Sequence, residues 1–128
     1  MIESGNIGSG TGEVEKSREL VLRTAEAKQA RADLLALKHL GPENAEVIDA
    51  QTRFAKALQQ EERLMTTLPA GVWISYHTAI TFKEAGFIEY AREAAYDGIR
   101  CIDTREYDTW DERDAWLERF DEIIRSQT

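Results

Sequence analysis

The chain has little of several features that would narrow its function at once. It holds a single cysteine and two prolines. One cysteine cannot form an internal disulfide, which fits a reducing compartment. No apolar run approaches the roughly 20 residues of a membrane-spanning helix, and the N-terminus lacks the cationic start and apolar stretch of a signal peptide. We therefore expect a cytoplasmic location in a host cell, or a place in a virion, and no membrane contact.

Motifs for catalysis and cofactor binding are also missing. The N-terminal glycines follow no predicted strand and precede no Lys-Ser/Thr pair, so they match neither a phosphate loop nor a dinucleotide fingerprint. Cys101, His77 and Asp103 are the residue types of a thiol nucleophile, base and orienting acid, but none lies in a local signature. The acidic loop 103–111 departs from EF-hand spacing. We expect a protein that is not an enzyme and has no cofactor or metal.

The length and the charge of the chain limit the number of domains and the kinds of partner it can have. The chain of 128 residues fits one domain, and its 42% hydrophobic and 31% charged residues are ordinary for a globular fold. Its formal net charge is −8. Nucleic acids and anionic membranes repel such a chain. We expect a protein partner or a homo-oligomer, and no direct binding of nucleic acid.

Aromatic and acidic residues are concentrated in the second half of the chain. Ten of the eleven aromatic residues follow residue 71, and Phe54 is the exception. Residues 84–122 contain thirteen acids against five arginines, whereas residues 1–83 balance eleven acids with ten bases. The two halves must therefore differ in the way they fold and in the surfaces they present.

We predict a mainly α-helical fold with four or five helices. A glycine-rich N-terminal arm, residues 1–12, precedes a single helical domain over residues 13–128. That domain consists of a helical hairpin, residues 13–68, and an acidic, aromatic-rich helical part, residues 72–128. The arm holds four of the eight glycines and few apolar side chains, so we expect contact with another chain to order it.

The predicted hairpin begins with a helix over residues 13–40, which contain strong helix formers and no Gly or Pro. Gly41 and Pro42 end this helix and begin the next, over residues 42–66, which must stop before Pro69. Because almost no loop separates the two helices, we predict an antiparallel hairpin or a sharp corner.

The first predicted helix has two apolar rows that lie side by side, and the second has one apolar row. The first row is Leu20, Ala27, Ala30, Leu34 and Leu37, the second is Val21, Ala25, Ala32 and Leu35, and the third is Val47, Phe54, Leu58 and Met65. Two rows on one helix are wide enough to touch more than one neighbour. The hairpin therefore either packs within one chain or also packs its outer stripe onto another chain.

The pattern of residues 72–80 fits both an α-helix and a β-strand. Their apolar side chains alternate as in a strand, but several also share one helical face. A helix is favoured because residues 83–95 are plainly helical and a lone strand needs a partner. The alternative is a short two-stranded pairing with residues 98–103.

For the last helix, Thr109 and Glu112 predict a capping box at its start. An apolar face follows, made of Trp116, Leu117, Phe120, Ile123 and Ile124.

The leading functional hypothesis is a non-enzymatic assembly or adaptor protein. It would be a small structural component of a larger complex, such as a phage particle. The helical stripe, with Leu20, Leu34 and Leu37, and the N-terminal arm would contact the partner.

The alternative hypothesis is an acidic inhibitor, phage-encoded, that mimics nucleic acid and blocks a basic nucleic-acid-binding surface. In such a protein, carboxylates steer the partner and aromatic side chains anchor it. The candidate contact residues are Tyr107, Asp108, Trp110, Asp111 and Asp114. Five arginines within residues 84–122 weaken this hypothesis, because they compensate part of the charge.

Overall fold

The computed structural model describes residues 4–65, 67–103 and 105–126. These residues form five α-helices and two short 3-10 helices, with no strand among them. The α-helices are α1 Ser4–Ala36, α2 Ala45–Glu62, α3 Val72–Glu84, α4 Ile88–Ile102 and α5 Arg113–Arg125, and the 3-10 helices are Lys38–Leu40 and Arg105–Tyr107. The predicted mainly α fold is confirmed. The two-stranded alternative is wrong, because both of its segments belong to helices, α3 and α4.

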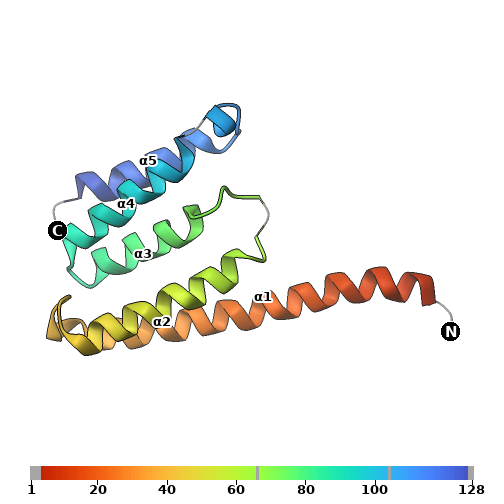
Figure 1. Ribbon diagram of the computed structural model, residues 1–128, viewed down its shortest axis with the longest axis horizontal. Helices are drawn as coiled ribbons and strands as arrows, with labels where there is room; N and C mark the ends of the chain where they lie inside the picture. The colour runs from red at the N-terminus through yellow and green to blue at the C-terminus, as the bar shows by residue number, and fades with distance from the viewer. Residues whose placement is uncertain (1–3, 66, 104, 127–128) are drawn as a thin grey trace.

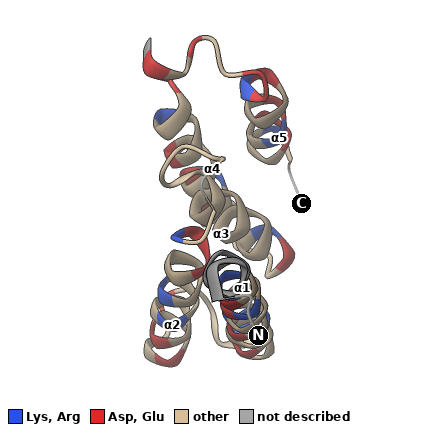
Figure 2. Cartoon of the chain, turned by 90° about the vertical axis from the view of Figure 1, so that its right-hand side faces the viewer, with Lys and Arg blue, Asp and Glu red and all other residues tan. Residues whose placement is uncertain are grey.

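The helices stack in chain order, with the α1–α2 hairpin at one end, α3 and α4 in the middle and α5 at the other end (Figure 1). Figure 2 shows the same division from the side, with the hairpin below the α3–α5 part. Neighbouring helices along the chain pack on one another, and α5 also touches α3. The molecule thus has two parts, which meet where α2 and α1 approach α3.

The hairpin forms as predicted, but its boundaries differ. Gly41 has a φ of 89°, a conformation that favours glycine, and its N–H donates to the carbonyl of Lys38. The second helix starts later than Pro42, because the Asn44 side chain accepts a hydrogen bond from the N–H of Glu46 at 2.8 Å and caps the helix there. Within the described residues, α1 begins at Ser4, so residues 4–12 of the predicted arm continue the first helix.

Aromatic side chains fill the core of the α3–α5 part. Tyr76 of α3 meets Trp116 and Phe120 of α5 edge to face, with ring centroids 5.3 and 6.0 Å apart. Phe120 lies on Gly98 of α4, where an added Cβ would come within 2.2 Å of the ring. Glycine is therefore needed at this position so that α5 can approach α4. The predicted burial of Trp116 and Phe120 is confirmed.

The predicted capping box at the start of the last helix is wrong. The helix begins at Arg113, its N-cap is Glu112, and no side chain caps it. The preceding residues form turns instead: the N–H of Trp110 donates to the carbonyl of Tyr107, and that of Arg113 donates to the carbonyl of Trp110. Since Trp110 packs against the core, the chain turns around this indole, and Thr109 lies outside the helix.

Candidate functional site

The first half of α1 extends past the rest of the molecule (Figure 1). Helix α1 has 33 residues and α2 has 18, so at about 1.5 Å of rise per residue α2 can cover only part of α1. The described hydrogen bonds between the two helices lie near the end of α2. The Thr24 hydroxyl donates to Glu61 at 2.6 Å, and Arg23 donates to Gln60 at 3.0 Å.

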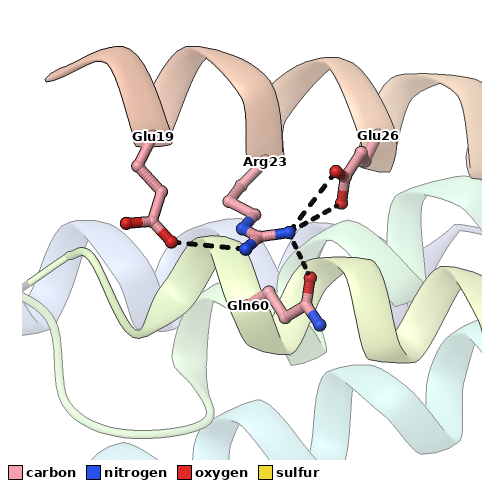
Figure 3. A network of polar contacts seen from close by, with 4 residues as sticks. All are labelled: Glu19, Arg23, Glu26 and Gln60. Atoms are coloured by element: carbon pink, nitrogen blue, oxygen red, sulfur yellow. Dashed lines mark hydrogen bonds and ion pairs between the residues drawn. The ribbon is translucent and has the colours of Figure 1, made fainter. Parts of the chain in front are cut away.

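Arg23 forms a polar network at the point where α2 ends (Figure 3). Its guanidinium pairs with Glu26 at 3.2 Å and with Glu19 at 3.3 Å, besides the hydrogen bond to Gln60. The hydrogen bonds to Glu26 and Glu19 raise the pKa of Arg23. Such exposed pairs contribute little stability, but among the described residues the Arg23–Gln60 bond is the interhelical hydrogen bond nearest the start of α1.

The two apolar rows of α1 have opposite environments. In the first row, Ala27 and Leu34 are buried, and Leu34 has no exposed surface. Leu37 packs against the same core, and Leu20 is half-buried. Helix α2 packs on this side of α1 within the same chain, and contact of the half-buried Leu20 and Leu37 with a partner stays a prediction. Leu34 in particular is unavailable to a partner.

Most of the second row of α1 is exposed, although Leu35 at its end is half-buried. Val21 is 69% exposed, Leu22 beside it is 62% exposed, and Val14, about two turns earlier, is 48% exposed. Ala25 and Ala32 of the same row are exposed as well. Exposed single apolar residues are ordinary, but here several share one side of a helix that no other described element covers. The side chains of residues 1–13 lie outside the described part, so the predicted contacts of the arm are untested.

A cavity of about 270 Å³ lies at the junction of α1, α2 and α3. Helix α1 supplies cationic and small side chains, α2 apolar ones and a carboxylate, and α3 two aromatic rings. The lining residues are Thr24, Ala27, Lys28, Arg31, Phe54, Leu58, Glu61, Trp73 and His77. Lys28 is exposed, so the cavity opens to solvent beside it.

Glu61 is the buried carboxylate of this cavity, with 4% of its surface exposed. One oxygen accepts the hydroxyl of Thr24 at 2.6 Å, and the other accepts the indole N–H of Trp73 at 2.7 Å. No ion pair among the described residues includes Glu61. Two strong hydrogen bonds therefore stabilise the charge of this carboxylate in place of a cation.

His77 lines the same cavity, and one of its ring nitrogens is covered by neighbouring atoms. Its Nε2 is buried and has no hydrogen-bond partner among the described residues. The ring stacks at a tilt on Trp73, with centroids 4.2 Å apart. Burial lowers the pKa of His77. The negative charge of Glu61 acts in the opposite direction and raises this pKa, whereas the positive charge of Arg31 lowers it further. Burial therefore favours the neutral form of this imidazole.

Two further polar contacts connect the hairpin to α3. The Glu62 carboxylate accepts the N–H groups of Gly71 at 3.0 Å and Ile74 at 3.1 Å, and so caps the start of α3. Arg31 of α1 donates to the hydroxyl of Thr81 at 3.1 Å and also pairs with Glu84. Polar side chains thus bridge the hairpin and the α3–α5 part in two further places.

His77 and Cys101, two of the residues considered above for thiol chemistry, have different surroundings. His77 lines the cavity, whereas the Cys101 sulfur lies against Gly71, where an added Cβ would come within 2.6 Å of it. Burial and the charges of Glu62 and Asp97 raise the pKa of Cys101, which keeps the thiol protonated. Across the part of the chain that is described, no three His, Cys, Asp or Glu side chains form a group that could hold a metal ion.

The aromatic and acidic candidates near residue 110 do lie together. The rings of Tyr107 and Trp110 are 6.5 Å apart and edge to face, beside a hollow of about 240 Å³ that they share with residues 67–70. Asp108 and Asp111 are exposed next to them. The remaining candidate, Asp114, is exposed too and lies 3.7 Å from the guanidinium of Arg113.

The junction cavity was missed in the sequence, although one signal for it was present. Glu61 stands three residues after Leu58 and seven after Phe54, which places a carboxylate on the apolar face of its helix. A charged residue on such a face is almost never buried without partners. The partners themselves, Thr24 and Trp73, lie far away in the sequence, and no local pattern identifies them.

Comparisons with known proteins identified no relative of this chain. A scan against protein-family models and searches of curated proteins and of solved structures returned no match to this chain. Among the described residues, no helix combines the length and apolar content needed to cross a membrane.

Proposed function

We propose that the protein is a non-enzymatic assembly protein whose projecting α1 packs against α1 of a second copy, as in a small structural component of a larger complex such as a phage particle. The observation that carries this proposal is the exposed apolar side of α1, with Val14, Val21 and Leu22, on a helix whose first half extends beyond α2 (Figure 1). Burying one such side chain stabilises an association by about 1.5 to 3 kcal/mol.

The charge distribution supports a second copy as the occupant. Residues 4–36 of α1 carry five acids and five bases, so two copies of this helix meet without net repulsion. Residues 84–122 carry thirteen acids against five bases, and two copies that met through this segment would repel each other. Self-association is therefore least opposed through the hairpin.

The native mass of the purified protein tests this proposal. We expect sedimentation and light scattering to show a concentration-dependent oligomer that Val21→Asp dissociates, with a rise in the dissociation constant of at least about tenfold. The matched control is Ile48→Asp, which makes the same kind of change at a residue of α2 that is 49% exposed. A monomeric wild-type protein at every concentration, or equal effects of the two variants, would contradict the proposal.

The N-terminal arm is tested by truncation. Removing residues 1–12 shortens α1 but leaves its contacts with α2 intact, so the oligomer should weaken while the melting temperature changes little. An oligomer of unchanged strength would show that the arm does not contribute to assembly.

The runner-up function is an acidic inhibitor of a basic nucleic-acid-binding protein. Its support is the pair of rings Tyr107 and Trp110 beside the exposed Asp108 and Asp111. Changing Asp108, Asp111 and Asp114 together to Asn should then abolish binding to the basic partner, and added salt should weaken it steeply. An assembly that survives both changes but is lost in Val21→Asp favours the first function.

A further inference from the structure

We propose that the cavity between α1, α2 and α3 binds a small aromatic anion, a carboxylate of the benzoate type. The ring enters the cavity, and the carboxylate stays at the opening beside Lys28. This inference is independent of the assembly function, because the cavity lies on the side of α1 that faces α2 and α3. It rests on the size of the cavity, on its apolar walls and on the lysine at its opening.

The size and the walls of the cavity fit a single aromatic ring. An enclosed apolar cavity of about 150 Å³ is enough to bind benzene, and this cavity measures about 270 Å³. Its apolar walls are the buried side chains of Ala27, Phe54 and Leu58. The half-buried indole of Trp73 adds a second aromatic ring on the α3 side. The part of a ligand that enters this cavity is therefore apolar.

Lys28 supplies a positive charge at the opening of the cavity. Its side chain belongs to the lining, and the residue is exposed. No ion pair among the described residues includes Lys28. The other lining cation, Arg31, is already paired with Glu84 and donates to the hydroxyl of Thr81. Lys28 is therefore the charge that remains available to a ligand, and it favours an anion over a neutral molecule.

The buried carboxylate of Glu61 determines which end of the ligand enters. Glu61 is 4% exposed, and its oxygens accept hydrogen bonds from Thr24 and Trp73, which stabilise its charge without a cation. A second carboxylate in the interior would meet this charge in a medium of low dielectric constant, where repulsion is strong. At the opening beside Lys28, water weakens the repulsion. The ligand therefore binds with its ring inward and its carboxylate outward.

The test compares benzoate with benzamide, an uncharged molecule of nearly the same shape, in NMR titrations. The wild-type protein should bind benzoate roughly fivefold more tightly, the effect of one partly exposed ion pair, and added salt should reduce this preference. Lys28→Gln should remove the preference. The matched control Lys16→Gln, at an exposed lysine of the same helix outside the cavity lining, should keep it. An unchanged preference in Lys28→Gln would overturn the proposal.

Two alanine substitutions test the position of the ring. Ala27→Leu fills the cavity and should abolish binding of both molecules, whereas Ala32→Leu, at an exposed residue of the same helix, should change neither affinity. Binding that survives in a folded Ala27→Leu would contradict the site. Val21→Asp, the variant that tests assembly, should bind benzoate as the wild type does, so the two proposals can fail separately.

A measurement on the wild-type protein keeps the proposal testable even if a variant fails to fold. The indole N–H of Trp73 donates to Glu61 at the cavity wall, so benzoate should shift its ¹⁵N–¹H resonance in a saturable manner. The indole resonances of Trp110 and Trp116, which lie outside the lining, should shift much less. The absence of saturable benzoate binding, equal affinities for benzoate and benzamide, or tighter binding of the cation benzylamine would each overturn the proposal.

Discussion

The hairpin and the α3–α5 part bury their apolar surface to different degrees. In the α3–α5 part, each helix packs on its neighbours around large aromatic rings, and Gly98 lets α5 approach α4 closely. In the hairpin, α2 covers one row of α1 and leaves Val21, Ala25 and Ala32 of the second row exposed, and the first half of α1 extends beyond α2. The difference suggests that the C-terminal part is complete within one chain, while the hairpin keeps an apolar surface available for another.

The largest expected effect concerns the closed aromatic core. Replacing Trp116 by Ala removes a buried ring that contacts Tyr76 and Phe120, and should lower the free energy of unfolding by about 3 to 5 kcal/mol. Urea unfolding, followed by circular dichroism, measures this change in the free energy of unfolding. The control Tyr96→Ala, at a half-exposed aromatic of α4, should stay within about 0.5 kcal/mol. Equal losses in the two variants would mean that the C-terminal core is not closed as described.

The two rows of α1 can be compared within one helix. Leu34→Ala should lower the stability by about 2 to 5 kcal/mol, because Leu34 is fully buried under α2. Val21→Ala should cost less than about 0.5 kcal/mol when measured on the monomer at low concentration. If Val21→Ala were as destabilising as Leu34→Ala under these conditions, the outer row would be covered within the chain.

Because α4 and α5 approach closely at Gly98, we predict that Gly98→Ala lowers the stability, the opposite of the usual effect of this change in a helix. Glycine to alanine in a helix usually stabilises by about 1 kcal/mol, but at Gly98 the new methyl group would meet the ring of Phe120. We expect a loss of about 1 to 3 kcal/mol from overpacking, seen as a lower melting temperature. The double variant with Phe120→Leu should recover part of this loss, and a stabilised Gly98→Ala would contradict the packing described.

The contact between the two parts depends on the cap of α3. Glu62→Ala removes the carboxylate that accepts from Gly71 and Ile74, and should cost about 0.5 to 2 kcal/mol. Hydrogen exchange should show faster opening at the first turn of α3 than in the wild type. Glu43→Ala, at an exposed residue of the α1–α2 connection, is the control and should leave that exchange unchanged.

The smallest effect is a pH dependence that arises at the junction. Because burial lowers the pKa of His77 in the folded state, the unfolded chain takes up the proton first. The stability should therefore fall as the pH drops below about 6.5 toward the folded pKa, and this contribution is fully present above about pH 7.5. His77→Phe should remove that slope, whereas His39→Phe, at an exposed histidine, should keep it. A slope that is the same in both variants would contradict the burial of His77.

The sequence predicted most of the fold because its local signals agree with the structure. Helix formers, the Gly41–Pro42 break and the apolar face around Phe120 act within a few residues, and they correctly indicated the hairpin and the buried last helix. Where two local signals competed, as in residues 72–80, a helix was favoured, and α3 confirms it. The capping box failed because the packing of Trp110 against the core delays the start of α5.

The sequence by itself thus determined the helical class, the two unlike parts and the existence of two apolar rows on the first helix. Only the tertiary structure decided which row is used, because both rows have similar periodicity and the position of α2 buries Leu34 while leaving Val21 exposed. It also created the junction cavity, since Thr24, Glu61 and His77 come from three helices. Helix periodicity acts over a few residues, whereas burial and hydrogen bonding between distant helices depend on how the whole chain packs.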